Sequence, residues 1–237
     1  MLFGRAFHAY LLQPELFKKG YIVFDPANRP EQDKGMTSKI NKEWREKFNE
    51  SGKDILTAEQ LIQIQDMKRS IMDNFYARAL LSNGSPETSF FTELNGVKVK
   101  ARADYWRVKK NKNIIVEVKT TTDARPDIFA RDMAKYNYHI SVAYYVDIVQ
   151  QITGNECDYL FIVVEKDAPH GMSILRPSDQ VHSCGCYEYE VLLELYNQCN
   201  QSNQFPGYGV WTDNKYDVQE IDLPGYAIKE INHKEIK

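Results

Sequence analysis

The sequence has few residues that could staple a fold together through disulfides or metal. Its 237 residues include only four cysteines, Cys157, Cys184, Cys186 and Cys199. So few thiols in a chain of this size suit a reducing compartment better than a disulfide framework. The Cys184-Gly-Cys186 spacing differs from the two-residue spacing usual in zinc and iron–sulfur sites, and no second pair lies at finger-like distance. Structural or idle thiols are therefore favoured over a metal site.

The chain also lacks a long apolar run and a strong net charge. No stretch of about 18 apolar residues is present, and the N-terminus has no small-residue cleavage site after an apolar core, so we expect a cytoplasmic protein. The net charge of -3 does not favour a nucleic-acid partner by itself. An apolar fraction of 43% and a charged fraction of 27% exclude the disordered and fibrous classes. The length allows one large domain or two small ones, and we expect one over residues 1–237.

Basic residues nevertheless crowd one short stretch that holds a single acid, Asp104. A solvated face is the favoured explanation, and a surface that binds a polyanion is the alternative. The stretch contains Lys98, Lys100, Arg102, Arg107, Lys109, Lys110 and Lys112.

Hydrophobic periodicity and turn signals predict the elements of the N-terminal part. A short apolar helix stopped by Pro14 precedes a strand at 20–24, and the polar stretch 25–54 has room for at most one short helix, near 42–48. Thr57-Ala58-Glu59-Gln60 is a capping box. It opens a helix with an apolar stripe that ends at Asn83-Gly84. The stripe contains Leu61, Ile64, Met67, Ile71, Phe75 and Leu80.

The remaining sequence alternates strands and helices. The segments 97–108 and 114–121 should form a hairpin, and a helix over 126–152 should deliver a buried strand at 159–164 beside it. Further elements are expected as a strand at 90–93, a strand at 172–175, a long helix over 178–200 and an irregular last 35 residues or so. This pattern predicts a central sheet flanked by helices, with an antiparallel hairpin at its centre.

The hairpin carries charged residues where a buried strand should be apolar. Side chains alternate along a strand, so Glu117 and Lys119 share one face. A turn centred between Lys110 and Asn111 places Asp104 opposite Glu117, and like charges at that position repel unless a divalent cation such as Mg²⁺ lies between them. The alternative is an edge-strand ion pair of Glu117 with Lys119 and a solvated Asp104.

These residues look like the signature of the PD-(D/E)xK nuclease superfamily, an acid on one strand followed by (D/E)-x-K on the next. More closely, the sequence resembles the RecE-type exonuclease (exodeoxyribonuclease VIII) catalytic domain, from Gly4 to about Pro177. The order and spacing of the motifs carry the resemblance. They are Gly4 to His8 followed by Leu12 to Phe17, Gly84 to Ser89, Ala101 to Asp104, Val116 to Thr121, and Tyr136 to Ile140.

The resemblance implies an α/β fold of mixed α+β type with a restriction-endonuclease-like core at about 55–177. A His-bearing segment at 1–54 precedes the core, and a C-terminal helix and wrap at 178–237 follow it. Relatives carry more sequence upstream of Gly4, so we expect part of the natural N-terminus to be missing or miscalled. Relatives also usually have Gln where this chain has Ser141, and the second acid is Glu117 where close relatives often have Asp.

The resemblance also implies roles for individual residues. His8, Asp104, Glu117 and the backbone carbonyl of Val118 match metal ligands for Mg²⁺ or Mn²⁺, although a lone His on a short apolar helix is by itself more often structural. Lys119 matches the catalytic lysine, and Glu87 matches a further acid of the catalytic site. The DNA contacts expected are Lys98, Lys100, Arg102, Arg125, Tyr138 and Tyr145. For Arg125 a helix-start surface charge, and for the tyrosines a place in the core, are the favoured alternatives.

The implied activity is Mg²⁺-dependent exonuclease hydrolysis of double-stranded DNA ends, in a bacterial or phage setting of recombination and repair. A DNA-end-binding recombination scaffold without activity and a PD-(D/E)xK endonuclease are the alternatives. A single-strand annealing protein and a homo-oligomeric ring around DNA are the implied partners.

Overall fold

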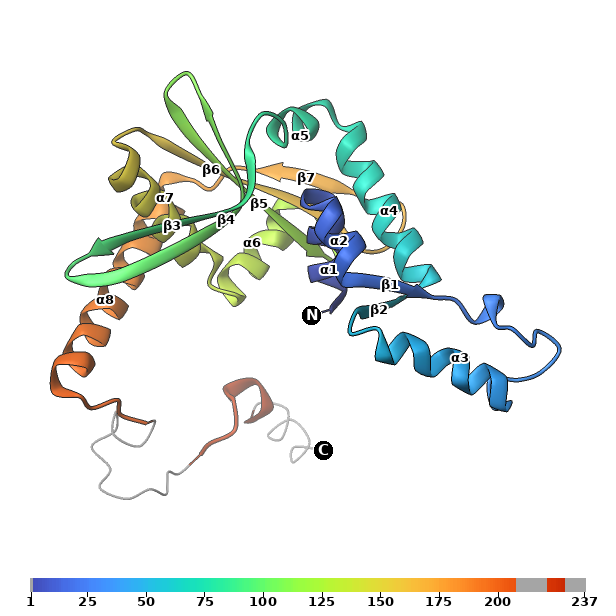
Figure 1. Ribbon diagram of the computed structural model, residues 1–237. Coiled ribbons are helices and arrows are strands. Elements are labelled where there is room, and N and C mark those ends of the chain that lie inside the picture. Colours follow the sequence, from blue (N-terminus) through green and yellow to red (C-terminus); the bar gives the residue numbers. More distant parts are fainter. Residues whose placement is uncertain (1, 208–220, 229–237) are drawn as a thin grey trace, which may run out of the picture. The chain divides into compact units, whose positions relative to one another are not determined.

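The structure of the chain, a computed structural model, describes residues 2–207 and 221–228 (Figure 1). The chain divides into two compact units, Met1–Val191 and Leu192–Lys237. The first unit contains the whole sheet and the residues of the candidate site. In the second unit, the rings of Tyr196 and Phe205 lie 6.3 Å apart, and a short helical turn follows Pro224.

A mixed sheet forms the centre of the first unit. Its strands lie in the order β3-β4-β5-β6-β7, and every neighbouring pair is antiparallel except β5 and β6, which are parallel. The sequence correctly predicts this arrangement, because the hairpin comes first and a helical crossover then delivers β6. The strands are β3 (Ser85–Leu94), β4 (Val97–Lys109), β5 (Lys112–Thr121), β6 (Cys157–Glu165) and β7 (Met172–Leu175).

A tight two-residue turn joins β4 to β5. Lys110 and Asn111 both have positive φ angles, 50° and 62°, as in the turns whose twist matches that of two antiparallel strands. The turn sets the register, in which Tyr105 lies opposite Val116 and Lys109 opposite Lys112. This is the predicted register.

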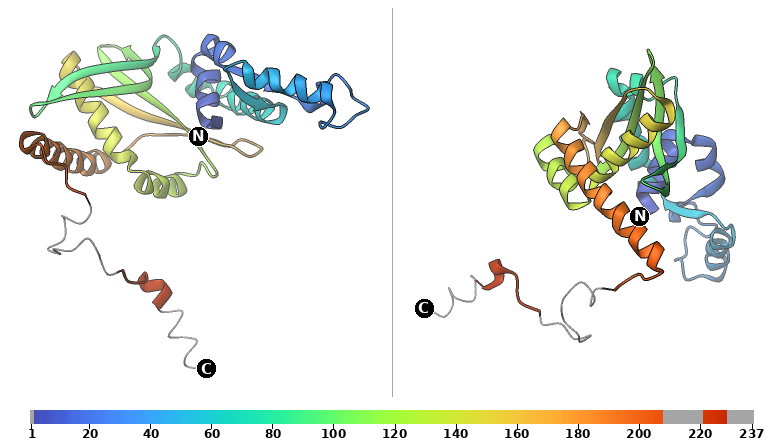
Figure 2. Two further views of the ribbon diagram at one scale, coloured as in Figure 1. Left: turned by 60° about the horizontal axis from the view of Figure 1, so that its bottom comes forward. Right: turned by 90° about the vertical axis from the view of Figure 1, so that its left-hand side faces the viewer.

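Helices cover both faces of the sheet (Figure 2). On one face, α1 (Leu2–Leu12) and α4 (Ala58–Asp73) pack with Val116 and Val118 of β5 in a core cluster. Both valines are fully buried, which stabilises the fold by about 1.5–3 kcal/mol each. On the other face, α7 (Tyr138–Thr153) packs across β3, β4, β5 and β6.

Two of the predicted helices are broken by a residue with its own capping geometry. The capping box at Thr57 and Gln60 is present and opens α4, but Asn74 ends α4 and accepts hydrogen bonds that start α5 (Phe75–Leu80). Phe75 is consequently 67% exposed and lies outside the predicted apolar stripe. The predicted helix over 126–152 is likewise two helices, α6 (Pro126–Lys135) and α7. The left-handed Asn137 separates them.

The N-terminal region contains more regular structure than the sequence predicts. Pro14 ends α1 as expected but also begins α2 (Pro14–Gly20), because proline suits the first position of a helix. Strand β1 (Tyr21–Phe24) pairs in parallel with β2 (Asp54–Thr57), which the sequence analysis missed. A 3-10 turn, η1 (Pro26–Asn28), follows β1, and α3 (Lys39–Glu50) is longer than predicted.

The C-terminal helix α8 (Asp179–Ser202) agrees closely with the predicted one. The predicted irregular ending lies largely outside the described residues, in 208–220 and 229–237. In the part of the chain that the structure describes, no helix is both long and apolar enough to cross a membrane.

Candidate active site

Three carboxylates form a row across three neighbouring strands. The pairs Pro86–Tyr105 and Thr88–Ala103 on either side place Glu87 of β3 opposite Asp104 of β4. Continuing the β4–β5 register one step past Tyr105–Val116 places Asp104 opposite Glu117 of β5. The predicted opposition of Asp104 and Glu117 therefore matches the structure, and Glu87 extends the row by one strand.

The regular pairing of β4 with β5 stops at this row, and the acids take over its hydrogen bonds. The backbone N–H of Asp104 donates to Glu117 Oε1 at 3.1 Å, and that of Val118 donates to Asp104 Oδ2 at 2.8 Å. On the other side, Glu87 has a φ of 49°, which is unusual for a residue other than glycine. The site is thus built into a gap in the sheet, where side-chain oxygens replace backbone carbonyls as acceptors.

Glu117 and Lys119 form a buried ion pair. Lys119 Nζ lies 2.9 Å from Glu117 Oε2 and 5.2 Å from the ring centre of Tyr138. Burial and the nearby Asp104 carboxylate raise the pKa of Glu117 to about 7, against the opposing effect of Lys119. Burial alone would lower the pKa of Lys119, but the carboxylates of Glu117 and Asp104 outweigh burial and raise the pKa, which favours the charged ammonium. The pair supplies a fixed cation beside the row.

The row extends to the N-terminal helix through His8. Its Nδ1 lies 3.5 Å from Asp104 Oδ1. Burial opposes protonation of His8, but Asp104 outweighs burial and raises the pKa of the imidazole. Burial alone would likewise raise the pKa of Asp104, but the hydrogen bond from His8 together with nearby positive charge lowers it. His8 therefore lies beside the carboxylate row and is not an isolated core histidine, and its role as a metal ligand stays a prediction.

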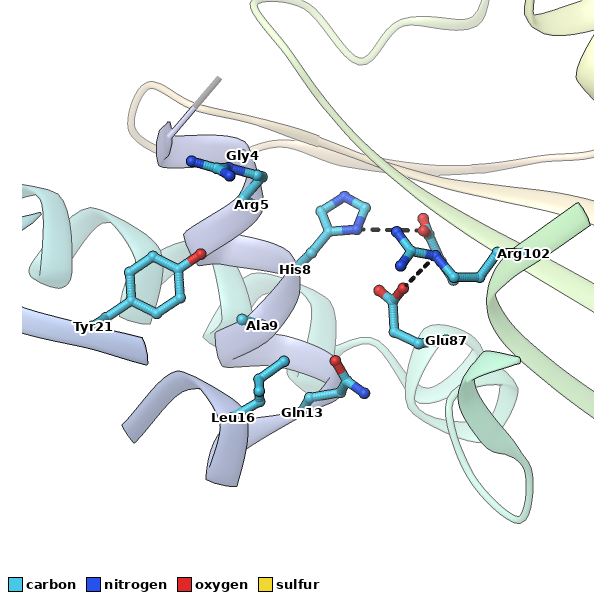
Figure 3. Close-up of a pocket in the computed structure, with 10 residues that line it drawn as sticks. Gly4, Arg5, His8, Ala9, Gln13, Leu16, Tyr21, Glu87 and Arg102 are labelled. Atoms are coloured by element: carbon cyan, nitrogen blue, oxygen red, sulfur yellow. Dashed lines mark ion pairs between the residues drawn. The ribbon is translucent and has the colours of Figure 1, made fainter. Parts of the chain in front are cut away.

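The third acid, Glu87, pairs with an arginine at the rim. Arg102 Nε lies 3.0 Å from Glu87 Oε2, and the arginine side chain is 69% exposed. Burial of Glu87 and the charge of Asp104 raise the pKa of Glu87 despite this arginine. Figure 3 shows Glu87 and Arg102 facing His8 across the pocket.

This pocket has a volume of about 420 Å³. Three of its lining residues were missed in the sequence analysis: Arg5, Gln13 and Tyr21. Arg5 follows Gly4 in the quoted Gly4-to-His8 motif, one helical turn before His8, and this spacing is the signal that could have identified it. The pocket joins the N-terminal helices to the carboxylate row.

The side chains present suit a divalent metal ion. Ligand atoms of His8, Glu87 and Asp104 lie within 4.8 Å of one another. An imidazole with carboxylates is a suitable donor set for Mn²⁺, and Mg²⁺ prefers the carboxylates. Glu117 was predicted as a ligand and lies next to this cluster, but its two oxygens are engaged by Lys119 and by the backbone of Asp104. The backbone N–H of Val118 donates a hydrogen bond to Asp104, and the carbonyl of Val118 stays a predicted metal ligand.

The predicted DNA contacts lie in three places. Lys98, Lys100 and Arg102 alternate with buried residues along β4 and are exposed on the stretch that leads to Asp104. Arg125 occupies the N-cap position of α6, and its exposed guanidinium is paired with Asp123 at 2.7 Å.

The two tyrosines predicted to contact DNA are half-buried on α7. Tyr138 lies beside Lys119. Tyr145 lines a pocket with Lys100 and Arg102. Both are therefore near the site and are packed into the protein.

Comparison with known proteins supports a nuclease-like fold. Residues 1–212 match a family described as "PDDEXK-like domain of unknown function (DUF3799)". A solved structure of a candidate exonuclease from Eubacterium rectale is similar at a TM-score of 0.58 and 18% identity, over 93% of this chain and 76% of that one. A structure called SSO0001 matches with a TM-score of 0.32 and 13% identity, over 81% and 84% of the two chains, which is too weak to support an argument. No curated protein matches.

Proposed function

We propose, from the premise that the chain belongs to the family of PDDEXK-like domains, that it is a metal-dependent nuclease that hydrolyses DNA phosphodiester bonds. The observation that carries this proposal is the row of Glu87, Asp104 and Glu117 with Lys119 beside it, at the point where strand pairing stops. Acids held this close are costly without a cation between them. The proposal explains why they are retained.

His8, Glu87 and Asp104, whose ligand atoms converge, would hold Mg²⁺ or Mn²⁺, with Glu117 and the carbonyl of Val118 as further ligands implied by the resemblance. When bound, such an ion lowers the pKa of a water molecule and polarises a phosphoryl oxygen. Lys119 would place a permanent positive charge near the reacting phosphate, where developing negative charge needs stabilisation. Glu117 keeps this ammonium in place at 2.9 Å.

The exposed side of β4 would hold the DNA. Lys98 and Lys100 are exposed on the part of β4 that leads to Asp104, and cations placed along a strand contact phosphates without reading bases. Arg102 forms an ion pair with Glu87, so it would both contact DNA and hold that carboxylate in position.

The more specific form of the proposal is an exonuclease that acts on double-stranded DNA ends, 5′ to 3′, in phage or prophage recombination and repair. Two points support it: the RecE-type motifs and the description of the similar Eubacterium rectale protein as a candidate exonuclease. A single-strand annealing protein would then be a partner, and a ring of copies around DNA would be the working assembly.

The test uses three substrates that differ only in their ends: end-labelled linear duplex, nicked circle and covalently closed circle. Each is incubated with the full chain in Mg²⁺ and in EDTA. We expect Mg²⁺-dependent loss of the linear duplex and no cutting of the closed circle. Cutting of the closed circle would instead establish an endonuclease.

The matched control is Lys119→Ala, which removes the cation and leaves the carboxylate row. It should bind linear duplex and not degrade it. Absence of degradation by the unaltered chain, together with retained binding of DNA ends, would replace the nuclease with a recombination scaffold. Full activity of Lys119→Ala would overturn the assignment of the site.

A further inference from the structure

A second cluster of ligating side chains lies between α7 and α8, outside the carboxylate row. Among residues 2–207 and 221–228, only two groups bring three or more His, Cys, Asp or Glu ligand atoms within 4.8 Å of one another. One is the group around Asp104. The other consists of Asp147, His182 and Cys186, all half-buried, and nothing in the proposed nuclease reaction uses it.

The helices are brought together by a glycine. Gly185 of α8 lies so close to α7 that an added Cβ would be 2.1 Å from the carbonyl oxygen of His139 and 2.9 Å from the Cβ of Ala143. Only a residue without a side chain permits this approach. His182 lies about one helical turn before Gly185, and Cys186 directly follows it. The same contact therefore brings both side chains up to α7.

The sequence spacing fixes which side chains meet. His182 and Cys186 are four residues apart on α8 and therefore project from one face of the helix. On α7, Asp147 is one helical turn beyond Ala143 and so lies on the same face as the contact with Gly185. Two ligands from one helix and one from its neighbour converge at a single point.

The distances within the cluster are close to those around a tetrahedral zinc ion. His182 Nε2 lies 3.3 Å from Asp147 Oδ1, Cys186 Sγ lies 3.5 Å from Asp147 Oδ2, and Cys186 Sγ lies 3.9 Å from His182 Nε2. Bond lengths of about 2.0–2.2 Å to nitrogen and oxygen and about 2.3 Å to sulfur imply ligand separations of about 3.3–3.6 Å. An ion at the centre therefore needs only small adjustments.

We propose that Asp147, His182 and Cys186 form a binding site for a transition-metal ion, Zn²⁺ in the first place, with water as the fourth ligand. The thiolate distinguishes this site from the carboxylate row, because sulfur favours Zn²⁺ over Mg²⁺. The side chains of His182 and Asp147 are 35% and 26% exposed, which leaves the ion accessible from solvent. The site clamps the first half of α8 to α7.

A further contact holds the carboxylate in position. The hydroxyl of Tyr189 donates to Asp147 Oδ2 at 2.5 Å, which leaves Oδ1 directed at His182. Metal-bound carboxylates are commonly held by such hydrogen bonds. Two residues beyond Cys186, Glu188 pairs with His139 of α7 at 3.0 Å and ties the same two helices together. The proposal departs from the expectation of structural or idle thiols for Cys186 alone, because Cys184 is exposed and lies outside the cluster.

The first experiment needs no substitution. The full chain is stripped of metal and treated with an alkylating reagent with and without Zn²⁺, and the modified cysteines are identified by mass spectrometry. We expect Zn²⁺ to slow alkylation of Cys186 roughly tenfold and to leave Cys184 almost unchanged, because a metal-bound thiolate is withdrawn from reaction. Equal rates for Cys186 with and without Zn²⁺ would overturn the proposal.

The second experiment uses Co²⁺ as a spectroscopic probe. One equivalent should give the visible absorption of tetrahedral Co²⁺ and a near-ultraviolet thiolate-to-cobalt band, and Zn²⁺ should displace it. Cys186→Ser should lose the thiolate band, and Cys184→Ser, two residues away on the same helix, should retain it. Retention of the band in Cys186→Ser contradicts the site.

Failure of this site and of the nuclease proposal can be told apart. Asp104→Asn damages the carboxylate row and should keep the thiolate band. Cys186→Ser should keep Mg²⁺-dependent DNA hydrolysis. His182→Gln provides a second removal of a ligand and should weaken Co²⁺ binding without touching any thiol, so a folding defect peculiar to Cys186→Ser does not decide the outcome.

Discussion

Two of the buried polar side chains of strand β5, Asn113 and Glu117, lie four residues apart and are satisfied in opposite ways. Asn113 is 1% exposed, and its partners are neutral: Trp106 Nε1 donates to its Oδ1 at 3.1 Å, and its Nδ2 donates to Thr153 Oγ1 at 2.8 Å. Near Asn113 the ladder with β4 is complete.

Glu117 is 5% exposed, and its partners are a cation, a backbone N–H and a nearby acid. There the ladder has stopped. At one end of the hairpin, neutral hydrogen bonds fully satisfy the Asn113 side chain. At the other end, Glu117 lies between a cation and a second acid, and this charged network forms the site. Burial of a polar group alone does not distinguish structure from function; the balance of charge around it does.

The largest expected effect is on DNA hydrolysis, and it should come from removing the charge of Glu117 and not from removing the side chain of Asn113. Glu117→Gln keeps the size of the side chain and removes its charge, so we expect a loss of about a thousandfold or more in Mg²⁺-dependent DNA hydrolysis. Asn113→Ala should keep most of the activity at a temperature where it is folded. Initial rates on linear duplex compare the two variants, and near-normal activity of Glu117→Gln would break the distinction.

For the free energy of unfolding we expect the reverse order, with a larger loss for Asn113→Ala than for Glu117→Gln. Asn113→Ala leaves the Trp106 N–H without its acceptor and removes one donor to the Thr153 hydroxyl, so we expect a loss of about 2 kcal/mol in the free energy of unfolding. Urea denaturation of the metal-free protein measures it. If Asn113→Ala lowers the free energy of unfolding less than Glu117→Gln does, the hydrogen bonds of Asn113 are not what stabilises the hairpin.

The charge on Glu117 should make the metal-free protein less stable as the pH rises. Its pKa is about 7 in the folded chain against an ordinary 4.5, so the folded state binds more protons than the unfolded state between these values. Stability from this group is therefore present below about pH 4.5 and is lost as the pH rises to about 7. Glu117→Gln should lack this loss, so the difference between the two proteins, on the order of 1–3 kcal/mol, should grow across that window. Thermal unfolding in EDTA tests it, and a constant difference would contradict the pKa.

The smallest effect concerns the basic residues at the two ends of the hairpin. Lys100 lies on the part of β4 that leads to the site, whereas Lys109 lies at the turn. Lys100→Ala should weaken binding of linear duplex a few-fold and reduce its salt dependence by about one counterion, and Lys109→Ala should do neither. Equal effects would mean that DNA is held by net charge and not along β4.

Local rules were enough to predict the hairpin but not all of its surroundings. The turn at Lys110-Asn111 fixes the register, and the register places Asp104 opposite Glu117, so two strands determine half of the site. Glu87 could be named only from the resemblance, because its position depends on where β3 starts, and β3 is longer than its apolar run of 90–93.

Errors occurred where single residues override a longer pattern. Asn74 and Asn137 each end a helix in the middle of an apolar periodicity, through a side-chain cap in one case and a left-handed backbone in the other. The Cys184-Gly-Cys186 motif did not indicate the proposed metal site, because only Cys186 belongs to that cluster, and Asp147 lies on another helix. Spacing along one segment cannot reveal such a site.

The position of His8 on the first helix determines when the site can assemble during synthesis of the chain. The ribosome releases α1 early, but the acid that His8 contacts, Asp104, follows only after α4 and β3 have been made. At about 5–20 residues per second, several seconds separate the two. A nascent chain therefore has no complete site, and the nuclease becomes competent only when its beginning and its middle have met.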